Sequence, residues 1–152
     1  MITFYKPKLE DLYFKELMLN DPLTMSFNHA YGGTISFPKD RWEKWYQNWI
    51  DVDKRFYRYI INEDHKYVGE ISYHYDDSFK LYLMDIIIYY PYRGRGYSIE
   101  GLNLLFVEAK NHGINVLYDN IAIDNPAYKL FIKMGFIEEY RNDEFIMMKK
   151  ML

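Results

Sequence analysis

The stretch LYLMDIIIYYPYRGRGYSIE, residues 81–100, decides the fold class of this sequence. Its first part, residues 81–89, is an apolar run rich in β-branched residues, which predicts a largely buried strand. Gly94 and Gly96 then form a turn, and the apolar residues after it recur at helical spacing over residues 98–111. A strand that passes through a glycine-containing turn into a helix is typical of proteins that combine a sheet with packed helices.

Further strands and helices are expected on both sides of this stretch. Apolar periodicity predicts strands over residues 2–5, 55–61, 66–75, 81–89, 116–123, 136–140 and 145–149, and helices over residues 8–19, 38–49, 98–111 and 126–134. Residues 25–35, which include Gly32 and Gly33, are expected to form a loop. The order βααβββαβαββ predicts a single domain over residues 1–152, of the α/β class (α+β, with a mixed sheet).

Four aromatic residues follow one another at helical spacing in the second of these helices. Trp42, Trp45, Tyr46 and Trp49 occupy positions i, i+3, i+4 and i+7, so they share one face. We expect this stripe to pack against the core, and a platform for a ligand is the alternative.

The composition excludes several classes of protein. The chain of 152 residues has a formal charge of −3 and no cysteine, which argues against nucleic acid as the main partner and excludes disulfides and thiolate metal sites. The histidines show no metal-binding spacing, so no metal is expected. The most apolar stretch is too short to span a membrane, and the first residues lack the features of a signal peptide. A soluble, cytoplasmic protein with no membrane partner is therefore expected.

The turn that contains Gly94 and Gly96 is a candidate anion-binding site. Backbone N–H groups at the start of a helix converge on one point, where the helix dipole adds positive potential. Arg93 and Arg95 add positive charge to the same turn, although an ordinary surface turn is the alternative. A P-loop is excluded because no Gly-Lys-Ser/Thr follows. A dinucleotide fingerprint would need a third glycine where Ile99 stands.

Two motifs in this part of the chain resemble those of the GNAT superfamily of acyl-CoA-dependent N-acetyltransferases. Arg93-x-x-Gly96-x-Ser98, after an apolar strand, is similar to the Gln/Arg-x-x-Gly-x-Gly/Ala signature of that family. The segment DNPAYKLFIKMGF, residues 124–136, resembles the second signature, Asn-x-x-Ala-x-x-Leu-Tyr-x-Lys-x-Gly-Phe. The order of the elements also matches, and the resemblance covers most of the chain apart from residues 25–37.

The resemblance implies a mostly antiparallel sheet with one splayed parallel pair of strands and helices on both faces. It also implies acetyl-CoA as the co-substrate, with the pantetheine arm inserted between the splayed strands. The residues that would bind acetyl-CoA are Ile86, Ile87 and Ile88, through their backbone, and Arg93, Gly94, Arg95, Gly96, Tyr97 and Ser98, at the pyrophosphate. Asn125 would take the place of the family asparagine, where this sequence has Asp124.

The reaction implied by the resemblance needs a base for the acceptor amine and groups that stabilise the thioester oxygen and the leaving thiolate. Glu70 or Asp85, directly or through a water, is the candidate base, and the backbone N–H of Ile88 is the candidate donor to the oxygen. The tyrosine that usually acts as the acid in the family is Phe131 here. The alternatives are Tyr128, one turn earlier, a water molecule, or a thiolate that leaves unprotonated.

These features together predict an N-acetyltransferase that moves an acetyl group from acetyl-CoA to a primary amine of a small molecule or peptide by direct attack. His29 and Tyr31 are expected to help shape the amine site. A non-catalytic acyl-CoA-binding sensor or scaffold with the same fold is the alternative, and another acyl-CoA as donor is a third option. The edge strands of such a sheet favour a homodimer.

Overall fold

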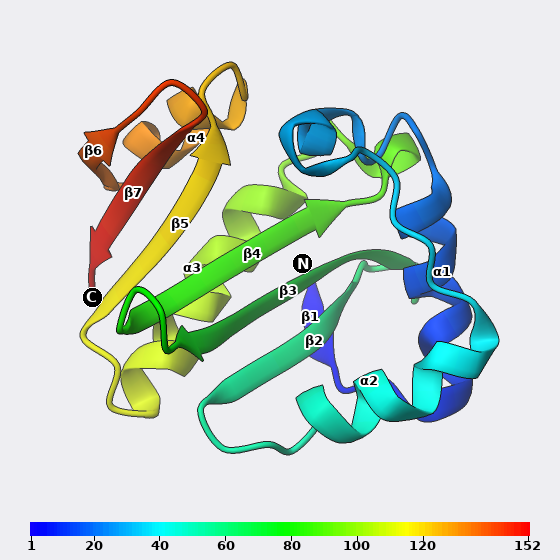
Figure 1. Cartoon of the computed structure of the whole chain (residues 1–152). Helices are drawn as coiled ribbons and strands as arrows, with labels where there is room; N and C mark the ends of the chain where they lie inside the picture. The colour runs from blue at the N-terminus through cyan, green and yellow to red at the C-terminus, as the bar shows by residue number, and fades with distance from the viewer.

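One sheet runs through the whole molecule in the computed structural model, which describes residues 1–152, with the side chains of residues 1–28 and 32–152 (Figure 1). The strands are β1 (Thr3–Tyr5), β2 (Arg55–Ile61), β3 (Tyr67–Asp76), β4 (Leu81–Ile88), β5 (Val116–Ala122), β6 (Ile137–Arg141) and β7 (Phe145–Met151). The α-helices are α1 (Tyr13–Asn20), α2 (Trp42–Trp49), α3 (Tyr97–Asn111) and α4 (Ala127–Lys133). Short 3₁₀ helices are η1 (Leu9–Leu12), η2 (Ser26–Tyr31), η3 (Lys39–Arg41) and η4 (Tyr90–Tyr92).

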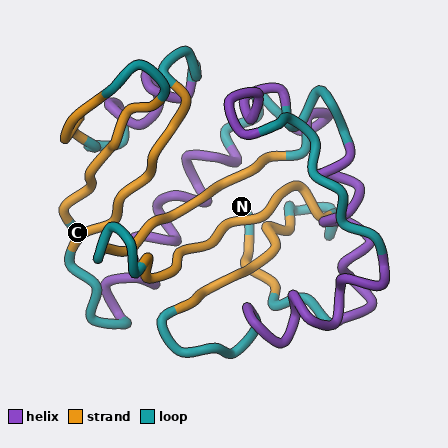
Figure 2. The backbone as a smooth tube through the Cα atoms, viewed as in Figure 1, coloured by secondary structure: helices purple, strands orange, loops and turns teal.

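The strands lie in the order β1-β2-β3-β4-β5-β7-β6, and β4–β5 is the parallel pair. Among the residues that the structure describes, Leu83 and Tyr118 are the only partners in register between β4 and β5. Beyond this point the two strands diverge toward their carboxyl ends, as Figures 1 and 2 show. On its other side, β4 pairs with β3 along the whole length of β4. The edge of β4 that faces β5 is therefore unpaired from Asp85 onward.

Helices cover both faces of the sheet, and each face has its own core. Ile86 and Ile88 join the larger core, which α3 and α4 complete. Ile87 lies on the opposite face and packs with residues from α1 and α2. The alternation of side chains along a strand produces this division. In the described part of the chain, no helix combines the length and the apolar character needed to cross a bilayer.

The fold class predicted from the sequence is confirmed, including the splayed parallel pair and the helices on both faces. One local prediction is wrong. The loop predicted over residues 25–35 contains η2, in which the N–H of Asn28 donates to the Met25 carbonyl (2.9 Å). The helix predicted over residues 8–19 is present, and its first turn is the 3₁₀ helix η1, where the N–H of Lys8 donates to the Asp11 carboxylate (2.9 Å). Such short turns have no apolar periodicity by which a sequence could reveal them.

Candidate active site

A cavity of about 750 Å³ opens where β4 and β5 diverge. Its wall includes residues 85–88 of β4 and residues 119–122 of β5. Side chains from α1 and α2 line it on one face of the sheet, and the start of α3 and residues of α4 line it on the other. The cavity therefore connects the two faces through the opening between the strands.

A buried ion pair lies in the cavity on the side of α1 and α2. Lys15 Nζ is 3.0 Å from each carboxylate oxygen of Glu70. Aromatic rings surround the same ammonium group, at centroid distances of 4.7 Å for Trp45, 5.0 Å for Tyr57 and 5.8 Å for Phe37. Cation–π attraction and the ion pair together hold a charged group that is largely removed from water. The ammonium group of Lys15 thus neutralises the carboxylate of Glu70.

The sequence analysis did not single out Lys15, although a signal was available. Lys15 lies three residues after Leu12 and four before Leu19, so it shares the apolar face of its helix.

The aromatic stripe of α2 has two environments: Trp42 is buried, as expected for core packing, whereas Trp45 lines the cavity. The stripe therefore contributes both to the core and to the site.

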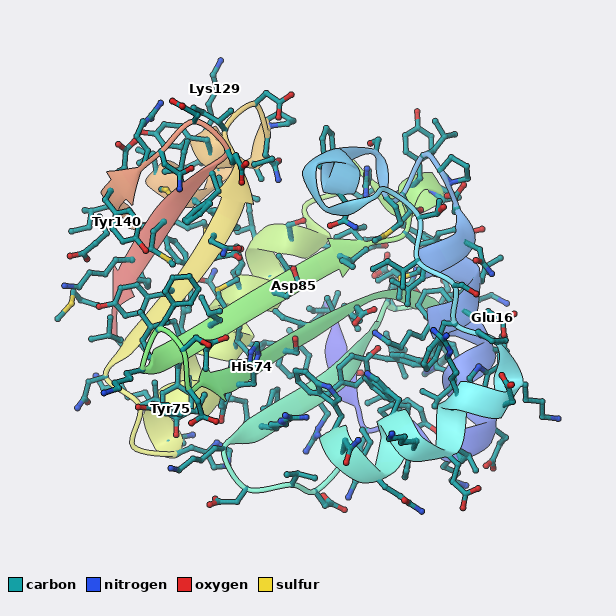
Figure 3. All side chains as sticks on the ribbon, in the orientation of Figure 1. Glu16, His74, Tyr75, Asp85, Lys129 and Tyr140 are labelled. Carbon is teal, nitrogen blue, oxygen red and sulfur yellow. The ribbon has the colours of Figure 1, made fainter. Side chains whose placement is uncertain are left out.

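Asp85 lies in the middle of β4, beside the opening between β4 and β5 (Figure 3). Its side chain is exposed to the cavity. Desolvation and repulsion by Glu70 raise the pKa of Asp85 to about 6, while Lys15 acts in the opposite direction. At neutral pH this group is largely ionised and is a stronger base than an ordinary aspartate.

Asp119 lies on β5, directly after the last residue in register with β4. Its partner on β7, Met148, belongs to the core on the side of α3 and α4, and only 7% of Asp119 is exposed. Burial, followed by repulsion from Asp85, raises the pKa of Asp119 well above its usual value. The two aspartates flank the opening, Asp85 from one face of the sheet and Asp119 from the other.

The unpaired edge of β4 presents backbone groups to the cavity. The N–H of Tyr89 donates to the Val68 carbonyl (2.8 Å), so Tyr89 faces β3, and by alternation Ile87 does too. The N–H and C=O groups of Ile86 and Ile88 therefore face the other way, toward β5. An extended ligand that contains amides can pair with such an edge as an added strand.

The turn before α3 has the backbone conformation that a close approach to a ligand requires. Gly94 and Gly96 have φ angles of +79° and +81°, which favour glycine, and both residues line the cavity together with Ser98. The side chain of Tyr97 is buried, and its hydroxyl donates to Glu63 (3.2 Å). Tyr97 can therefore offer its backbone to a ligand, while its ring belongs to the core.

The two arginines of this turn have different surroundings. The guanidinium of Arg93 donates to the carbonyls of Ile88 (3.0 Å) and Thr24 (2.7 Å), and its burial lowers the pKa of Arg93. Arg93 therefore fastens the segment before η2 to the end of β4. Arg95 lies over the ring of Tyr92, 5.5 Å from the centroid.

The predicted residues of α4 are not all brought to the cavity. Asn125 lines it, and its Oδ1 accepts the N–H of Ala127 (2.9 Å) at the start of the helix. Phe131 also lines the cavity and is 2% exposed. Tyr128 is not among the described residues that line it, and its hydroxyl donates to Glu138 Oε1 (3.3 Å).

The two residues predicted to shape the amine site, His29 and Tyr31, have side chains outside the described residues. Their neighbours Phe27 and Asn28 line the cavity. The structure thus places Glu70, Asp85 and the residues of the glycine turn other than Arg95 around one cavity. The catalytic and binding roles of all these residues stay predictions.

Comparisons with known proteins identify the class that this fold and cavity represent. The family model described as "Acetyltransferase (GNAT) domain" matches residues 2–137. The chain therefore belongs to the GNAT acetyltransferase family and is an acyltransferase. A comparison with curated protein sequences gave no match.

Solved structures share the fold over almost the entire chain. The spermidine N-acetyltransferase of Vibrio cholerae, in complex with CoA and spermine, has a TM-score of 0.81 and 19% identity, covering 99% of this chain and 95% of that chain. A GNAT-family acetyltransferase of Bacillus anthracis has a TM-score of 0.75 and 16% identity, covering 99% and 94%. At these identities the likeness demonstrates the fold and leaves the substrate open.

Proposed function

We propose that this protein transfers the acetyl group of acetyl-CoA directly to a primary amine of a small molecule. The observation that carries the proposal is the position of Asp85, an ionisable carboxyl group with a raised pKa at the opening between β4 and β5. An ammonium group must lose a proton before its nitrogen can attack a thioester. Asp85 is the base for this step, directly or through a water.

The charge of the cavity favours a cationic acceptor. Glu70 and Asp85 line it, and Lys15 neutralises Glu70. The carboxylate of Asp85 then attracts the ammonium group of the acceptor before the proton is removed.

The donor side of the cavity fits acetyl-CoA, which supplies the activated acyl group. The N–H and C=O groups of Ile86 and the N–H of Ile88, on the edge of β4 that faces β5, suit the amides of a pantetheine arm. The N–H groups of residues 93–98 suit the pyrophosphate, because they precede and begin the helix α3. The N–H of Ile88 is the proposed donor to the thioester oxygen.

Spermidine is the first acceptor to test. The solved Vibrio cholerae relative is a spermidine N-acetyltransferase in complex with CoA and spermine, and a polyamine matches the negative charge around Asp85 in the cavity described here. A peptide amine is the broader alternative within the same reaction class.

A non-catalytic acyl-CoA-binding module is the second candidate function. Phe131 favours it, because a phenylalanine ring at this position of the cavity has no proton to donate. Such a module would bind acetyl-CoA tightly without acetylating any amine.

Two measurements on the purified protein distinguish these functions. Acetyl-CoA at ~100 times its Kd should add about 2.7 kcal/mol to the free energy of unfolding, which raises Tm by several degrees, while NADH should not. Thiol release from acetyl-CoA is then followed with spermidine, spermine and simple monoamines. Because the chain has no cysteine, a thiol reagent detects only the released CoA.

We expect Asp85→Asn to keep the stabilisation by acetyl-CoA and to lower kcat by roughly 10²–10⁴-fold. Stabilisation without thiol release for every amine would support the binding module instead. No stabilisation by acetyl-CoA would overturn both functions.

A cytoplasmic location and a homodimer are further parts of the proposal. β6 is the last strand at one edge of the sheet, and all of its residues are exposed. An exposed edge strand favours pairing with a second copy. Light scattering of the purified protein would measure its mass in solution, which distinguishes a monomer from a homodimer.

A further inference from the structure

Asp119 lines the cavity but has no role in the steps proposed above. It is 7% exposed, and the structure describes no hydrogen bond or ion pair between it and another described residue. A buried carboxylate without a partner is strongly destabilising, whereas the protonated form carries no charge. Burial therefore favours the protonated form of Asp119, which has a proton that it can donate.

Asp119 stands at the closed end of the opening between β4 and β5. Tyr118, the residue before it, is in register with Leu83, so the strands are paired on one side of Asp119 and separated on the other. The glycine turn lies at the opposite end of the opening, after the carboxyl end of β4. An extended ligand held at that turn and directed along β4 ends beside Asp119.

Asp119 and the proposed base, Asp85, lie on opposite faces of the sheet. Asp119 shares the side of α3 and α4, where its partner Met148 belongs to the core. Asp85 pairs with Ser72 of β3 and lies on the side of Lys15 and Glu70. An acceptor that approaches Asp85 thus attacks from one side of the sheet, and the leaving group departs on the other.

We propose that Asp119 is the general acid of the transfer, and that its carboxyl proton goes to the sulfur of the departing CoA. This proposal rests on the acetyl-transfer function proposed above. A residue of β5 would then protonate the leaving thiolate, which Phe131 of α4 cannot do because its ring has no acidic proton.

The proton balance of this step involves both aspartates. As the nitrogen–carbon bond forms and the carbon–sulfur bond breaks, the sulfur keeps the bonding electron pair. Asp119 donates its proton to that sulfur and becomes a carboxylate, which yields the CoA thiol. The first proton, which Asp85 takes from the ammonium group before the attack, passes to solvent. Asp85 then accepts a second proton from the attacking nitrogen, so the products are neutral amide and thiol. Transfer of that proton from Asp85 to Asp119, through water in the cavity, restores both groups.

The surroundings of the two aspartates support this division of roles. Burial, followed by repulsion from Asp85, keeps the pKa of Asp119 high. Met148, the partner of Asp119 on β7, and Phe131, which lines the same cavity, carry no charge. Lys15, by contrast, acts on Asp85 and limits its pKa to about 6. Two carboxyl groups whose environments separate their pKa values can serve as acid and base at one pH.

Asp119→Asn tests the proposal, because asparagine keeps the shape of the neutral acid but has no acidic proton. We expect the variant to keep its Tm and its stabilisation by acetyl-CoA, and to lose about tenfold or more in kcat with spermidine at an unchanged KM. The wild-type kcat should fall as the pH rises through the pKa of Asp119, and the variant should lack this decrease. Asp119→Glu should recover part of the rate. Asp143→Asn, in the exposed turn between β6 and β7, is the matched control and should behave as wild type.

Infrared difference spectroscopy provides a measurement that needs no acceptor. At about pH 8, where exposed carboxyl groups are ionised, the wild type should show the carbonyl band of a protonated carboxylic acid, and Asp119→Asn should lack it. CoA should shift this band, and desulfo-CoA, which lacks the sulfur, should not.

A band that CoA leaves unchanged, or an Asp119→Asn variant with the wild-type kcat and pH profile, would overturn the role of Asp119. If the wild type acetylates none of the amines, the transfer function fails instead. The infrared shift then decides by itself whether Asp119 contacts the sulfur.

Discussion

Tyr57 and Tyr59 are alternate residues of β2 whose buried hydroxyl groups have opposite surroundings. In the described part of the chain, the hydroxyl of Tyr57 has no hydrogen-bond partner. The hydroxyl of Tyr59 accepts the N–H of Lys15 (3.2 Å) and donates to the carbonyl of Asp11 (2.8 Å). Burial raises the pKa of both tyrosines, so both hydroxyls stay protonated. The contribution of each hydroxyl to stability therefore depends on its partners and not on its burial.

Removal of the two hydroxyl groups should have effects of opposite sign. Tyr57→Phe keeps the ring over Lys15 and removes an unpaired polar atom, so the free energy of unfolding should rise by about 1 kcal/mol. Tyr59→Phe leaves a buried N–H and a carbonyl unpaired and should lower the same free energy by about 1–3 kcal/mol. Urea unfolding of both variants measures the difference. Equal changes in the two variants would show that the hydrogen bonds of Tyr59 contribute nothing.

At the scale of the elements, the close approach of β3 and β4 positions the strand that borders the cavity. A Cβ atom placed on Gly69 would lie 2.4 Å from the carbonyl oxygen of Ile87 and 3.2 Å from the Cα of Ile88. Both contacts involve backbone, which cannot move without moving β4 itself. Glycine at this position therefore sets the distance between β3 and the edge proposed to bind acetyl-CoA.

Gly69→Ala should lower the free energy of unfolding by roughly 1–3 kcal/mol, because the methyl group overpacks the backbone. It should also reduce the Tm shift caused by acetyl-CoA, since Ile87 and Ile88 must move. Gly113→Ala is the control: its φ of +81° is strained for alanine, but no atom lies within 4 Å of its Cβ. We expect that variant to lose about 1–2 kcal/mol and to keep the acetyl-CoA shift. If acetyl-CoA raised the Tm of Gly69→Ala as much as that of the wild type, the close approach of β3 and β4 would not be required for cofactor binding.

At the scale of the whole molecule, folding gathers three carboxyl groups and one ammonium group around a single cavity. Glu70, Asp85 and Asp119 come from three neighbouring strands, and Lys15 comes from α1. Lys15 compensates the charge of Glu70, and burial raises the pKa of Asp85 and Asp119. The site is thus built from groups that oppose the stability of the fold.

The stability of the protein should depend on pH through Asp85. Its pKa is raised from 3.8 to about 6 on folding, so the folded state binds this proton more tightly than the unfolded state. Stability should therefore fall as the pH rises through this interval, and the loss should persist above it. Asp85→Asn removes the loss, so its Tm should exceed that of the wild type at about pH 7.5, with a smaller difference at about pH 4. Melts at the two pH values measure this, and a pH-independent difference would contradict the assigned cause.

The sequence by itself determined the order of the strands and helices, the glycine turn before α3, and Glu70 and Asp85 as carboxyl groups on strands. These features follow from short-range periodicity and motifs, which neighbouring residues are sufficient to define. Only the tertiary structure decided that Lys15 pairs with Glu70, 55 residues away, and that the Arg93 guanidinium binds backbone carbonyls. It also decided that Asp119, which belongs to no motif, stands where β4 and β5 separate. The reason is physical: ion pairs, burial and the splay of two strands arise from contacts between distant segments, and no local pattern encodes them.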